Sequence, residues 1–304
     1  MNEDSITKID VVQIEKKETV APVDALPTPL KDQSEPVSSS LKVPVQKVEK
    51  IALVYSLMDP AGELIFKKIE EIGIPDWAVV YSFEKDIIFT PIEKVKESKV
   101  IFLSKHASAS GTRSLTVHMI GNFGDAKYGG HSRELCGTLP WIGANYLRVL
   151  DKKNISSGLN KQGFTVSYES THHGPFTNKQ CVFIELGSSP AEWKNELGAK
   201  VIAETVIEST LTRSPDRIVI GLGGGHYAPD FTKLTLRKGY AFGHMCPKHH
   251  LDDFNFSMLK QMIAKSRASE IILDWKGLKE HKERILALCK KSGLPFERVQ
   301  NLLK

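Results

Sequence analysis

The sequence contains few cysteines, and their spacing gives no paired motif. Its four cysteines, Cys136, Cys181, Cys246 and Cys289, are scattered and form no C-x-x-C pair. This spacing indicates neither a disulfide framework nor a zinc ribbon built from cysteine, so we expect reduced thiols. Cys246 is a conceivable nucleophile, but no neighbouring residue stands out as its base, and we assign it no such role.

Long apolar runs and targeting signals are also missing. No apolar stretch approaches the roughly 18 residues that cross a bilayer, and the N-terminus lacks the charged-then-apolar order of a secretory signal. A transit peptide would be rich in arginine, whereas the first arginine of the chain is Arg113. The hydrophobic content of 41% and charged content of 25% are typical of a soluble globular protein. We therefore expect a cytoplasmic protein with no membrane partner.

Aromatic residues are absent from the first 49 positions. This segment cannot bury enough apolar surface to offset the entropy of ordering it, so we expect residues 1–49 to be a disordered extension. It holds nine acidic residues and six lysines, a net charge of −3, which leaves 5 − (−3) = +8 for residues 50–304. A positive folded part suits a polyanionic partner, although ordinary solvated lysines would give the same excess.

From residue 50 onward, short apolar runs alternate with segments of helical periodicity. The alternation favours an α/β fold with a mainly parallel or mixed sheet flanked by helices. The predicted strands are 51–57, 78–81, 87–90, 100–104, 181–186 and 217–222. The predicted helices are 61–72, 92–98, 141–149, 198–212, 257–265, 279–292 and 297–302.

A run of hydroxyl, imidazole and guanidinium side chains follows the predicted strand at 100–104. The run SKHASASGTRSLTVH contains Ser104, His106, Ser108, Arg113 and His118. Such side chains supply hydrogen-bond donors to a phosphate or a ribose, and histidine also binds metal or carries protons. A serine-rich turn that caps a helix is the alternative interpretation.

Two histidines stand beside a glutamate in the segment YESTHHGPF. Glu169, His172 and His173 lie at the end of an apparent strand, ahead of a Gly-Pro pair. Adjacent residues on extended chain point to opposite sides, so one imidazole can bind metal or activate water while the other packs or orients it. A lone histidine is usually structural, but this combination favours a functional site.

Glycine-rich segments occur twice. GLGGGHYAP follows the predicted strand at 217–222, and the amides of residues 223–225 can form a nest for an anion or an oxyanion, with His226 at its tip. It has neither the G-K-[ST] ending of a P-loop nor the G-x-G-x-x-G spacing of a dinucleotide site, so neither ATP nor NAD is indicated. GNFGDAKYGG, at 121–130, either lets backbone approach a ligand or is a plain surface loop.

The last cluster is YAFGHMCPKHH, which contains His244, Lys248, His249 and His250. Histidines and a carboxylate without paired cysteines are the composition of a catalytic zinc centre, which keeps one position open for water. There is no H-E-x-x-H, so the zinc peptidase helix is absent. Spacing alone does not select which histidines bind the metal.

Together these segments resemble, in order, the D-aminoacyl-tRNA deacylases of archaea and plants. The resemblance rests on SKHASASGTRSLTVH, GNFG with a following GG, YESTHHGP, ELGSSPAEW, GLGGGHYAPDFT and GHMCPKH, and it covers residues 50–304. It implies a monomeric, zinc-associated hydrolase whose fold is similar to peptidyl-tRNA hydrolase and nucleoside phosphorylases. The implied reaction releases a D-amino acid, typically D-tyrosine, from tRNA. Met119 and Ile120 replace an expected proline-containing pair, which affects only the local loop path.

We predict three groups of site residues within a catalytic domain that spans residues 50–304. The catalytic group comprises Glu169, His172, His173, His226 and the amides of Gly224 and Gly225. The tRNA-binding group comprises Ser104, His106, Ser108, Arg113, His118 and Lys248. The zinc ligands come from His106, His172, His226 and His244.

In the expected mechanism, a metal acidifies a water molecule, and Glu169 or a nearby histidine takes its proton. Assistance by the terminal ribose 2′-hydroxyl would make a protein base unnecessary. Two other functions remain open at this point: a phosphorylase or hydrolase of free nucleosides, and a non-catalytic tRNA-binding protein.

Overall fold

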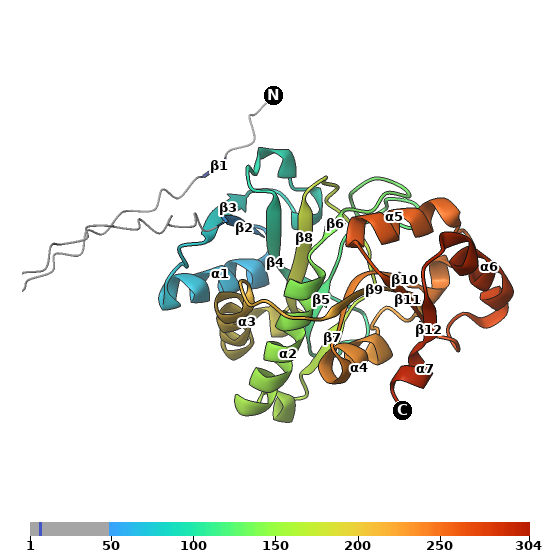
Figure 1. The fold of residues 1–304 in the computed structure, drawn as a ribbon. Coiled ribbons are helices and arrows are strands. Elements are labelled where there is room, and N and C mark those ends of the chain that lie inside the picture. Colours follow the sequence, from blue (N-terminus) through green and yellow to red (C-terminus); the bar gives the residue numbers. More distant parts are fainter. Residues whose placement is uncertain (1–5, 8–48) are drawn as a thin grey trace, which may run out of the picture.

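Two β-sheets organise the chain, with helices packed against them (Figure 1). The computed structural model describes residues 6–7 and 49–304, so the predicted disordered extension falls almost wholly outside the described part. The larger sheet has the order β1-β3-β2-β4-β8-β5-β7, with β6 beside β8. Its strands are β1 (Ile6–Thr7), β2 (Ile51–Ser56), β3 (Ala78–Phe83), β4 (Lys99–Ala107), β5 (Ser114–His118), β6 (Gly137–Thr138), β7 (Thr165–Tyr168) and β8 (Gln180–Ser188).

The smaller sheet has the order β10-β9-β11-β12, and all its pairs are parallel. Its strands are β9 (Arg217–Gly224), β10 (Tyr240–Pro247), β11 (Glu270–Leu273) and β12 (Phe296–Arg298). In the larger sheet β3, β2, β4 and β8 are mutually parallel, whereas β5 runs antiparallel to β8. The predicted α/β class with a mainly parallel or mixed sheet is confirmed.

Seven α-helices lie in the described part of the chain, joined by short 3-10 turns. The α-helices are α1 (Pro60–Ile72), α2 (Pro140–Ser156), α3 (Glu196–Ser209), α4 (Pro229–Lys238), α5 (Phe256–Ser266), α6 (Lys282–Ser292) and α7 (Val299–Leu302). The 3-10 turns are η1 (Ile87–Phe89), η2 (Ile92–Lys94), η3 (Leu159–Gln162), η4 (Glu192–Lys194), η5 (Lys248–His250) and η6 (Lys279–His281). Helix α2 contacts β5 of the larger sheet and β10 of the smaller one, so it ties the two together. None of the described helices has the length and apolarity needed to cross a membrane.

The central strands are buried on both faces, which explains their continuous apolar sequences. In β2, Leu53 packs in the core cluster shared with α1 and α3, while Val54 packs in a cluster on the opposite face. Phe102 of β4 stacks on Phe183 of β8 in that second cluster, with ring centroids 4.4 Å apart. Helices and loops therefore cover this part of the larger sheet from both sides.

Asp59 joins the start of α1 to the end of β4. Its Oδ1 accepts the N–H groups of Ala61 and Gly62 at 3.0 and 2.9 Å, as an N-cap does. Its Oδ2 accepts the Ser104 hydroxyl at 3.0 Å and the Lys105 N–H at 2.8 Å. One buried carboxylate thus fixes the strand end at which the chemically active residues begin.

Three secondary-structure predictions need correction. The predicted helix at 92–98 contains only the 3-10 turn η2 before β4 begins at Lys99. The predicted strand at 87–90 is instead the 3-10 turn η1 (Ile87–Phe89), because Asp86 Oδ1 accepts the Ile88 N–H and caps the turn. The predicted helix at 297–302 starts only at Val299, because Phe296 to Arg298 pair with β11. The last quarter also contains β10 and β11, which the helical periodicity of its other segments obscured.

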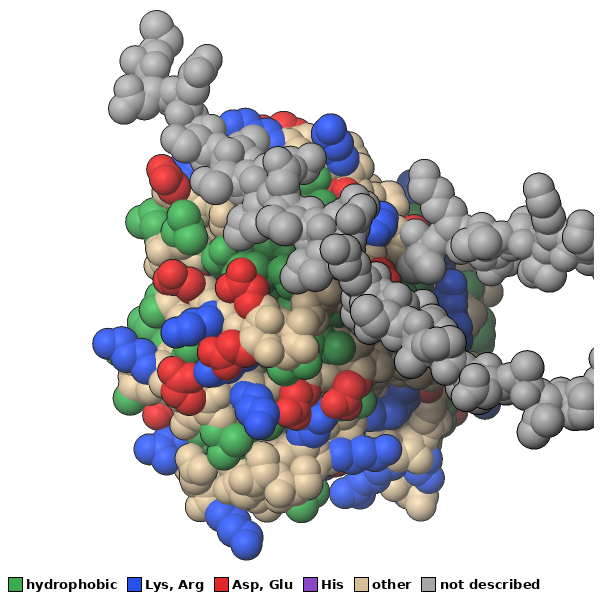
Figure 2. Space-filling view, turned by 90° about the vertical axis from the view of Figure 1, so that its left-hand side faces the viewer, with side chains coloured by type: hydrophobic (Ala, Val, Ile, Leu, Met, Phe, Trp, Pro, Cys, Tyr) green, Lys and Arg blue, Asp and Glu red, His purple; other side chains and the backbone are tan. Residues whose placement is uncertain are grey.

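The face that contains α1 and β3 carries a mixture of basic and acidic side chains. Figure 2 shows blue and red side chains interspersed there, and no histidine of the described residues is in view. On α1, Lys68 Nζ lies 2.8 Å from carboxylate oxygens of both Glu71 and Glu196. The visible part of this face therefore has no compact basic patch that would attract a polyanion.

Candidate active site

Strand ends from both sheets meet at one place. His106 lies near the end of β4, His118 is the last residue of β5, Glu169 directly follows β7, and His226 follows β9. An isolated antiparallel bridge between Glu169 and Tyr227 links the two sheets at this point. Strand ends in open α/β sheets are where loops bring functional groups together, and the two sheets here contribute to a single centre.

Backbone hydrogen bonds to both sheets fix the segment that leads to His172 and His173. The Glu169 N–H donates to the Val117 carbonyl of β5 at 3.0 Å. The Ser170 N–H donates to the His226 carbonyl at 2.8 Å, and the Thr171 N–H donates to the Met245 carbonyl at 3.0 Å. His173 adopts a left-handed backbone with φ 46°, which interrupts the alternation of an extended chain. The rings of His172 and His173 lie 4.4 Å apart, so the prediction that they point to opposite sides is wrong.

Five of the predicted histidines form one cluster of rings. The centroid of His172 lies 4.3 Å from that of His118, 4.4 Å from that of His173 and 4.9 Å from that of His226. His106 and His226 are 5.9 Å apart. The prediction that distant loops gather these imidazoles is confirmed.

Two buried glutamates lie against these rings. Glu169 places Oε1 3.1 Å from Nδ1 of His106 and Oε2 2.9 Å from Nε2 of His226. Glu185, in β8, lies 3.5 Å from nitrogens of both His106 and His118. Sequence analysis missed Glu185; the signal that pointed to it is one carboxylate inside the apolar strand CVFIEL.

The glutamates and the first two histidines shift one another's protonation. Burial lowers the pKa of His106, but hydrogen bonding to Glu169 and Glu185 outweighs it and raises that pKa to about 11. Burial also lowers the pKa of His118, but the negative charge of Glu185 outweighs burial and raises that pKa. Burial raises the pKa of Glu185, yet His118 and His106 bring it down to about 2. The buried carboxylates and these two imidazoles therefore favour one another's charged forms.

Two further imidazoles of the cluster, His172 and His173, are held neutral. Burial, followed by the charge of His118, lowers the pKa of His173 to about 4. The same causes place the pKa of His172 well below its ordinary value. Neutral imidazoles have a free lone pair, which is the form that binds metal.

Two sets of side chains bring potential ligand atoms within 4.8 Å of one another: His118 with His172 and His173, and His106 with Glu169 and His226. In the first set, Nε2 of His118 is buried without a hydrogen-bond partner. In the second, both Glu169 oxygens lie near ring nitrogens but make no aligned hydrogen bond. Three imidazoles, or two with a carboxylate, are donor sets that zinc accepts, so these residues fit a zinc ion.

His244 does not join this cluster. It is fully buried, with Nε2 2.9 Å from the Cys136 carbonyl oxygen and Nδ1 3.1 Å from the Thr171 hydroxyl. Since a carbonyl only accepts, Nε2 carries the proton and Nδ1 accepts from Thr171. Both nitrogens are occupied, so the prediction of His244 as a metal ligand is wrong, and the residue instead braces the loop that holds His172.

Two predicted tRNA-binding residues lie elsewhere. Arg113 donates to the Gln162 carbonyl at 2.7 Å and pairs with Glu192 at 3.1 Å, beside β8 rather than beside the imidazoles. Ser108 hydrogen-bonds Ser110 within an exposed turn. Neither lines a cavity at the cluster, because the chain turns outward after β4.

Two hollows open beside the imidazoles, and His172, His173, His226 and Tyr128 line both. The Ile88 hollow, of about 410 Å³, is lined also by Ile87, Ile88, Ala107, Ser104, Lys105 and His106. The Arg133 hollow, of about 440 Å³, is lined also by Lys127, Arg133, Phe123, His249 and His250. Lys248 belongs to the same turn as His249 but does not line the hollow itself.

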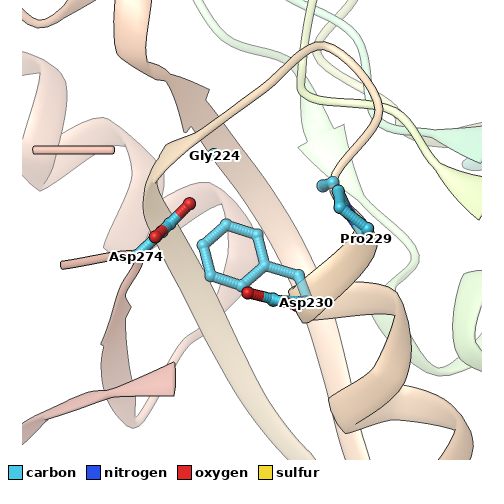
Figure 3. A pocket seen from close by; sticks show the side chains of 6 residues that line it. Gly224, Pro229, Asp230 and Asp274 are labelled. Carbon is cyan, nitrogen blue, oxygen red and sulfur yellow. The ribbon is translucent and has the colours of Figure 1, made fainter. Parts of the chain in front are cut away.

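The glycine-rich turn after β9 has a different place from the predicted one. Gly224 lines a separate cavity of about 20 Å³ together with Pro229, Asp230, Phe231 and Asp274, and Figure 3 shows Asp274 close to Gly224. This volume holds about one water molecule. Gly225 lines none of the three cavities, so the predicted role of these amides at an oxyanion is not supported.

Tyr227 and Lys105 also belong to the site but were not predicted from the sequence. The Tyr227 hydroxyl lies 2.9 Å from Nε2 of His106, so the imidazole has a partner on each nitrogen. Lys105 lines the Ile88 hollow with its Nζ 3.9 Å from Asp59 Oδ2. In the sequence, Tyr227 follows His226 and Lys105 precedes His106. This proximity to two predicted site residues is the only feature of the sequence that pointed to them.

The fold and the site define a class: α/β proteins whose strand ends enclose a buried histidine–glutamate centre. The family model described as D-aminoacyl-tRNA deacylase matches residues 93–297, and the chain belongs to this family. The resemblance inferred from the sequence motifs is confirmed.

Relatives match over nearly their whole length. The D-aminoacyl-tRNA deacylase of Methanococcus vannielii is 35% identical over 256 residues, covering 81% of this chain and 98% of the relative. That of Pyrococcus furiosus is 33% identical over 85% of this chain and 95% of its own. A crystal structure described as a conserved protein of unknown function, AF0625, superposes with a TM-score of 0.78 at 25% identity, covering 84% of this chain and 97% of the other.

Proposed function

We propose that this chain hydrolyses the ester that joins a D-amino acid to the 3′ end of tRNA, a quality-control step of translation. The observation that carries the chemistry is the buried Glu169 carboxylate, which lies between His106 and His226 at the joined strand ends. D-tyrosyl-tRNA is the proposed test substrate. The proposed working form is a monomer in the cytoplasm, where charged tRNA is used.

The first metal set, His118 with His172 and His173, is the proposed zinc site. His172 and His173 are neutral because their pKa values are lowered. The buried Nε2 of His118 makes no aligned hydrogen bond, with its nearest carboxylate, that of Glu185, 3.5 Å away. Zinc bound there would supply a Lewis acid that polarises the ester carbonyl and acidifies water. The set His106, Glu169 and His226 is the alternative.

Glu169 and His226 are the proposed proton carriers. His226 is partly exposed, with 42% of its side chain accessible, whereas the Glu169 carboxylate is fully buried behind it. A carboxylate 2.9 Å from one ring nitrogen orients the imidazole. His226 then takes the proton of the attacking water and returns it to the ribose oxygen that leaves.

Lys105 and the cluster's neighbours hold the substrate in the proposed mechanism. An aminoacyl ester is already reactive, so holding the carbonyl beside the water contributes much of the rate. Lys105 lines the Ile88 hollow next to His106, and its backbone is fixed by Asp59. The ester therefore meets a site whose positions are set before it binds.

The decisive experiment compares matched D- and L-tyrosyl-tRNA, with and without a chelator. We expect rapid release of D-tyrosine, slow release of L-tyrosine, and loss of the D-activity when zinc is removed. Equal cleavage of both esters, or of neither, would reject the proposed reaction. Chelator-insensitive cleavage of the D-ester alone would reject only the zinc.

A further inference from the structure

Tyr128 occupies a special position among the described residues. Apart from three histidines of the cluster, it alone lines both the Ile88 hollow and the Arg133 hollow. Although it stands between two cavities, 69% of its surface is exposed. A large aromatic side chain that is open to solvent at the mouth of a site offers its ring face for a flat ligand to stack on.

The backbone that carries Tyr128 is firmly held. Its carbonyl accepts the Gly174 N–H at 2.9 Å, and the next carbonyl, that of Gly129, accepts the Asn122 side-chain amide at 2.9 Å. Gly129 has φ +73°, and a Cβ there would collide with the Ile88 carbonyl oxygen. The ring is therefore presented from a fixed loop, which reduces the entropy lost when a ligand stacks on it.

A second exposed ring lies nearby. Phe89, in η1, is 54% exposed and approaches the same face of Gly129. Nucleobases of single-stranded RNA stack on such aromatic surfaces, since every base has a flat π-face. On the other side of Tyr128, Lys127 and Arg133 line the Arg133 hollow together with Asp125 and Asp253, and Arg133 reaches Asp253 at 3.6 Å. Lys127 and Arg133 are the side chains there that can meet a phosphate.

The chemistry of the substrate matches this division. In an aminoacyl ester at the 3′ end of tRNA, the reacting carbonyl lies between an amino-acid side chain and a nucleotide. Such a substrate needs room on both sides of the reacting atoms. The imidazoles that the two hollows share lie at the junction. The walls differ, since Ile87, Ile88 and Ala107 give the first hollow an apolar part, whereas the second carries the charged side chains of Lys127, Arg133, Asp125 and Asp253.

Resting on the proposed function, we propose that Tyr128 is the stacking platform for the terminal adenine of the single-stranded CCA end. The nucleotide backbone enters through the Arg133 hollow, where Lys127 and Arg133 meet its phosphates. The amino-acid side chain lies in the Ile88 hollow. Tyr128 thus takes over the adenosine-binding role that the sequence pattern had placed on Ser108 and Arg113.

The test combines a binding measurement with kinetics on the same preparations. The single-stranded trinucleotide CCA is titrated into the full-length protein and three variants: Tyr128→Ala, Tyr128→Phe and Ile155→Ala. Ile155 is 59% exposed on α2 and lines neither hollow, so it is a matched control for removing an exposed apolar side chain. Hydrolysis of D-tyrosyl-tRNA is measured in parallel.

We expect Tyr128→Ala to weaken CCA binding about tenfold and to raise KM by a similar factor with kcat nearly unchanged, because a lost base stack affects binding alone. Tyr128→Phe keeps the ring and should bind CCA like the wild type, as should Ile155→Ala. Unchanged CCA binding by Tyr128→Ala, or equal losses in the alanine and phenylalanine variants, would overturn the platform. The wild-type protein could bind CCA in a way that depends on Tyr128 and yet leave D-tyrosyl-tRNA uncleaved. That result would support the platform and reject only the proposed reaction.

Discussion

At the residue scale, the buried carboxylate of Glu169 controls the candidate centre. It faces three imidazoles from a position with no exposed surface, where charge is costly unless it is compensated. Burial raises its pKa, but His106 and His226 hold that pKa well below the ordinary value. Glu169 is therefore ionised at neutral pH and orients its histidine neighbours.

Replacing Glu169 with glutamine should lower kcat for D-tyrosyl-tRNA by about 10²- to 10⁴-fold, since His226 loses the carboxylate 2.9 Å away that orients its ring for proton transfer. The circular dichroism spectrum should be unchanged, and bound zinc should remain because the proposed ligands are His118, His172 and His173. Glu134→Gln is the control, because Glu134 pairs only with the exposed His131. Full activity in Glu169→Gln would contradict the proposed proton pathway.

His244 illustrates how a buried neutral histidine links stability to pH. Burial lowers the pKa of His244 to about 4 from the ordinary 6.5. Between about pH 6.5 and pH 4, His244 is therefore protonated in the unfolded chain but neutral in the folded chain. Its contribution to the free energy of unfolding falls as the pH drops through this range.

His244→Phe should be less stable than wild type at pH 7 by about 1–3 kcal/mol, because Thr171 and the Cys136 carbonyl lose a partner. Its stability should change less between pH 6.5 and pH 4, since this proton site is gone. Urea unfolding of metal-free protein at several pH values measures both effects. Parallel pH profiles for the two proteins would argue against this assignment.

At the element scale, α1 and β4 are joined through a single capping side chain. Asp59 serves the helix with one oxygen and the strand end, at Ser104 and Lys105, with the other. Packing is equally close here, since a Cβ at Gly62 would strike the Leu103 carbonyl oxygen. The position of Lys105 in the Ile88 hollow therefore depends on how α1 begins.

Asp59→Ala should cost about 1–3 kcal/mol of unfolding free energy and should also raise KM, because the cap and the anchor of Lys105 disappear together. Asn195→Ala removes another N-cap, on α3, whose Oδ1 accepts the Gly198 N–H at 2.7 Å. That variant should lose about 1 kcal/mol without a change in KM. Chemical denaturation and steady-state kinetics distinguish the two, and equal KM effects would disprove the link to the site.

At the scale of the whole molecule, two sheets and the loops between them form one charge-balanced centre. Glu185 comes from the larger sheet and His226 from the smaller one, while His172 lies on the loop hydrogen-bonded to both. The centre therefore depends on the docking of the sheets, to which α2 contributes by contacting both. Metal binding, protonation and tertiary structure are coupled in such an arrangement.

Zinc uptake by the metal-free protein should release about one proton per ion at pH 7. The raised pKa of His118 means that it must lose a proton to bind, whereas the lowered pKa values of His172 and His173 leave them already neutral. Below the raised pKa of His118, apparent affinity should fall about tenfold per pH unit as pH decreases. Calorimetry in buffers of different ionisation enthalpy counts the protons.

His173→Ala should bind zinc weakly, and His131→Ala, which alters an exposed histidine outside both metal sets, should bind it normally. If His173→Ala retains zinc while Glu169→Gln loses it, the metal belongs to the alternative set.

The amino-acid sequence by itself determined the alternation of strands and helices, because burial on both faces leaves a periodic apolar record at 51–57, 100–104 and 181–186. It also determined that histidines gather at loops and that the ordered motifs are those of the family. These features depend on local pattern, which a linear chain displays directly.

Only the tertiary structure decided which side chains face one another. Periodicity shows which face of an element is apolar, but not which element packs against that face. His244 and His226 both occur in histidine-containing motifs, yet His244 lies inside the protein and hydrogen-bonds Thr171 and the Cys136 carbonyl. The position of Glu185 depends on the pairing of β8 with β4. The position of Tyr128 depends on the close contact between Gly129 of the glycine-rich loop and the Ile88 carbonyl. Arg113 lies outside the site because it precedes β5, which runs antiparallel to β8.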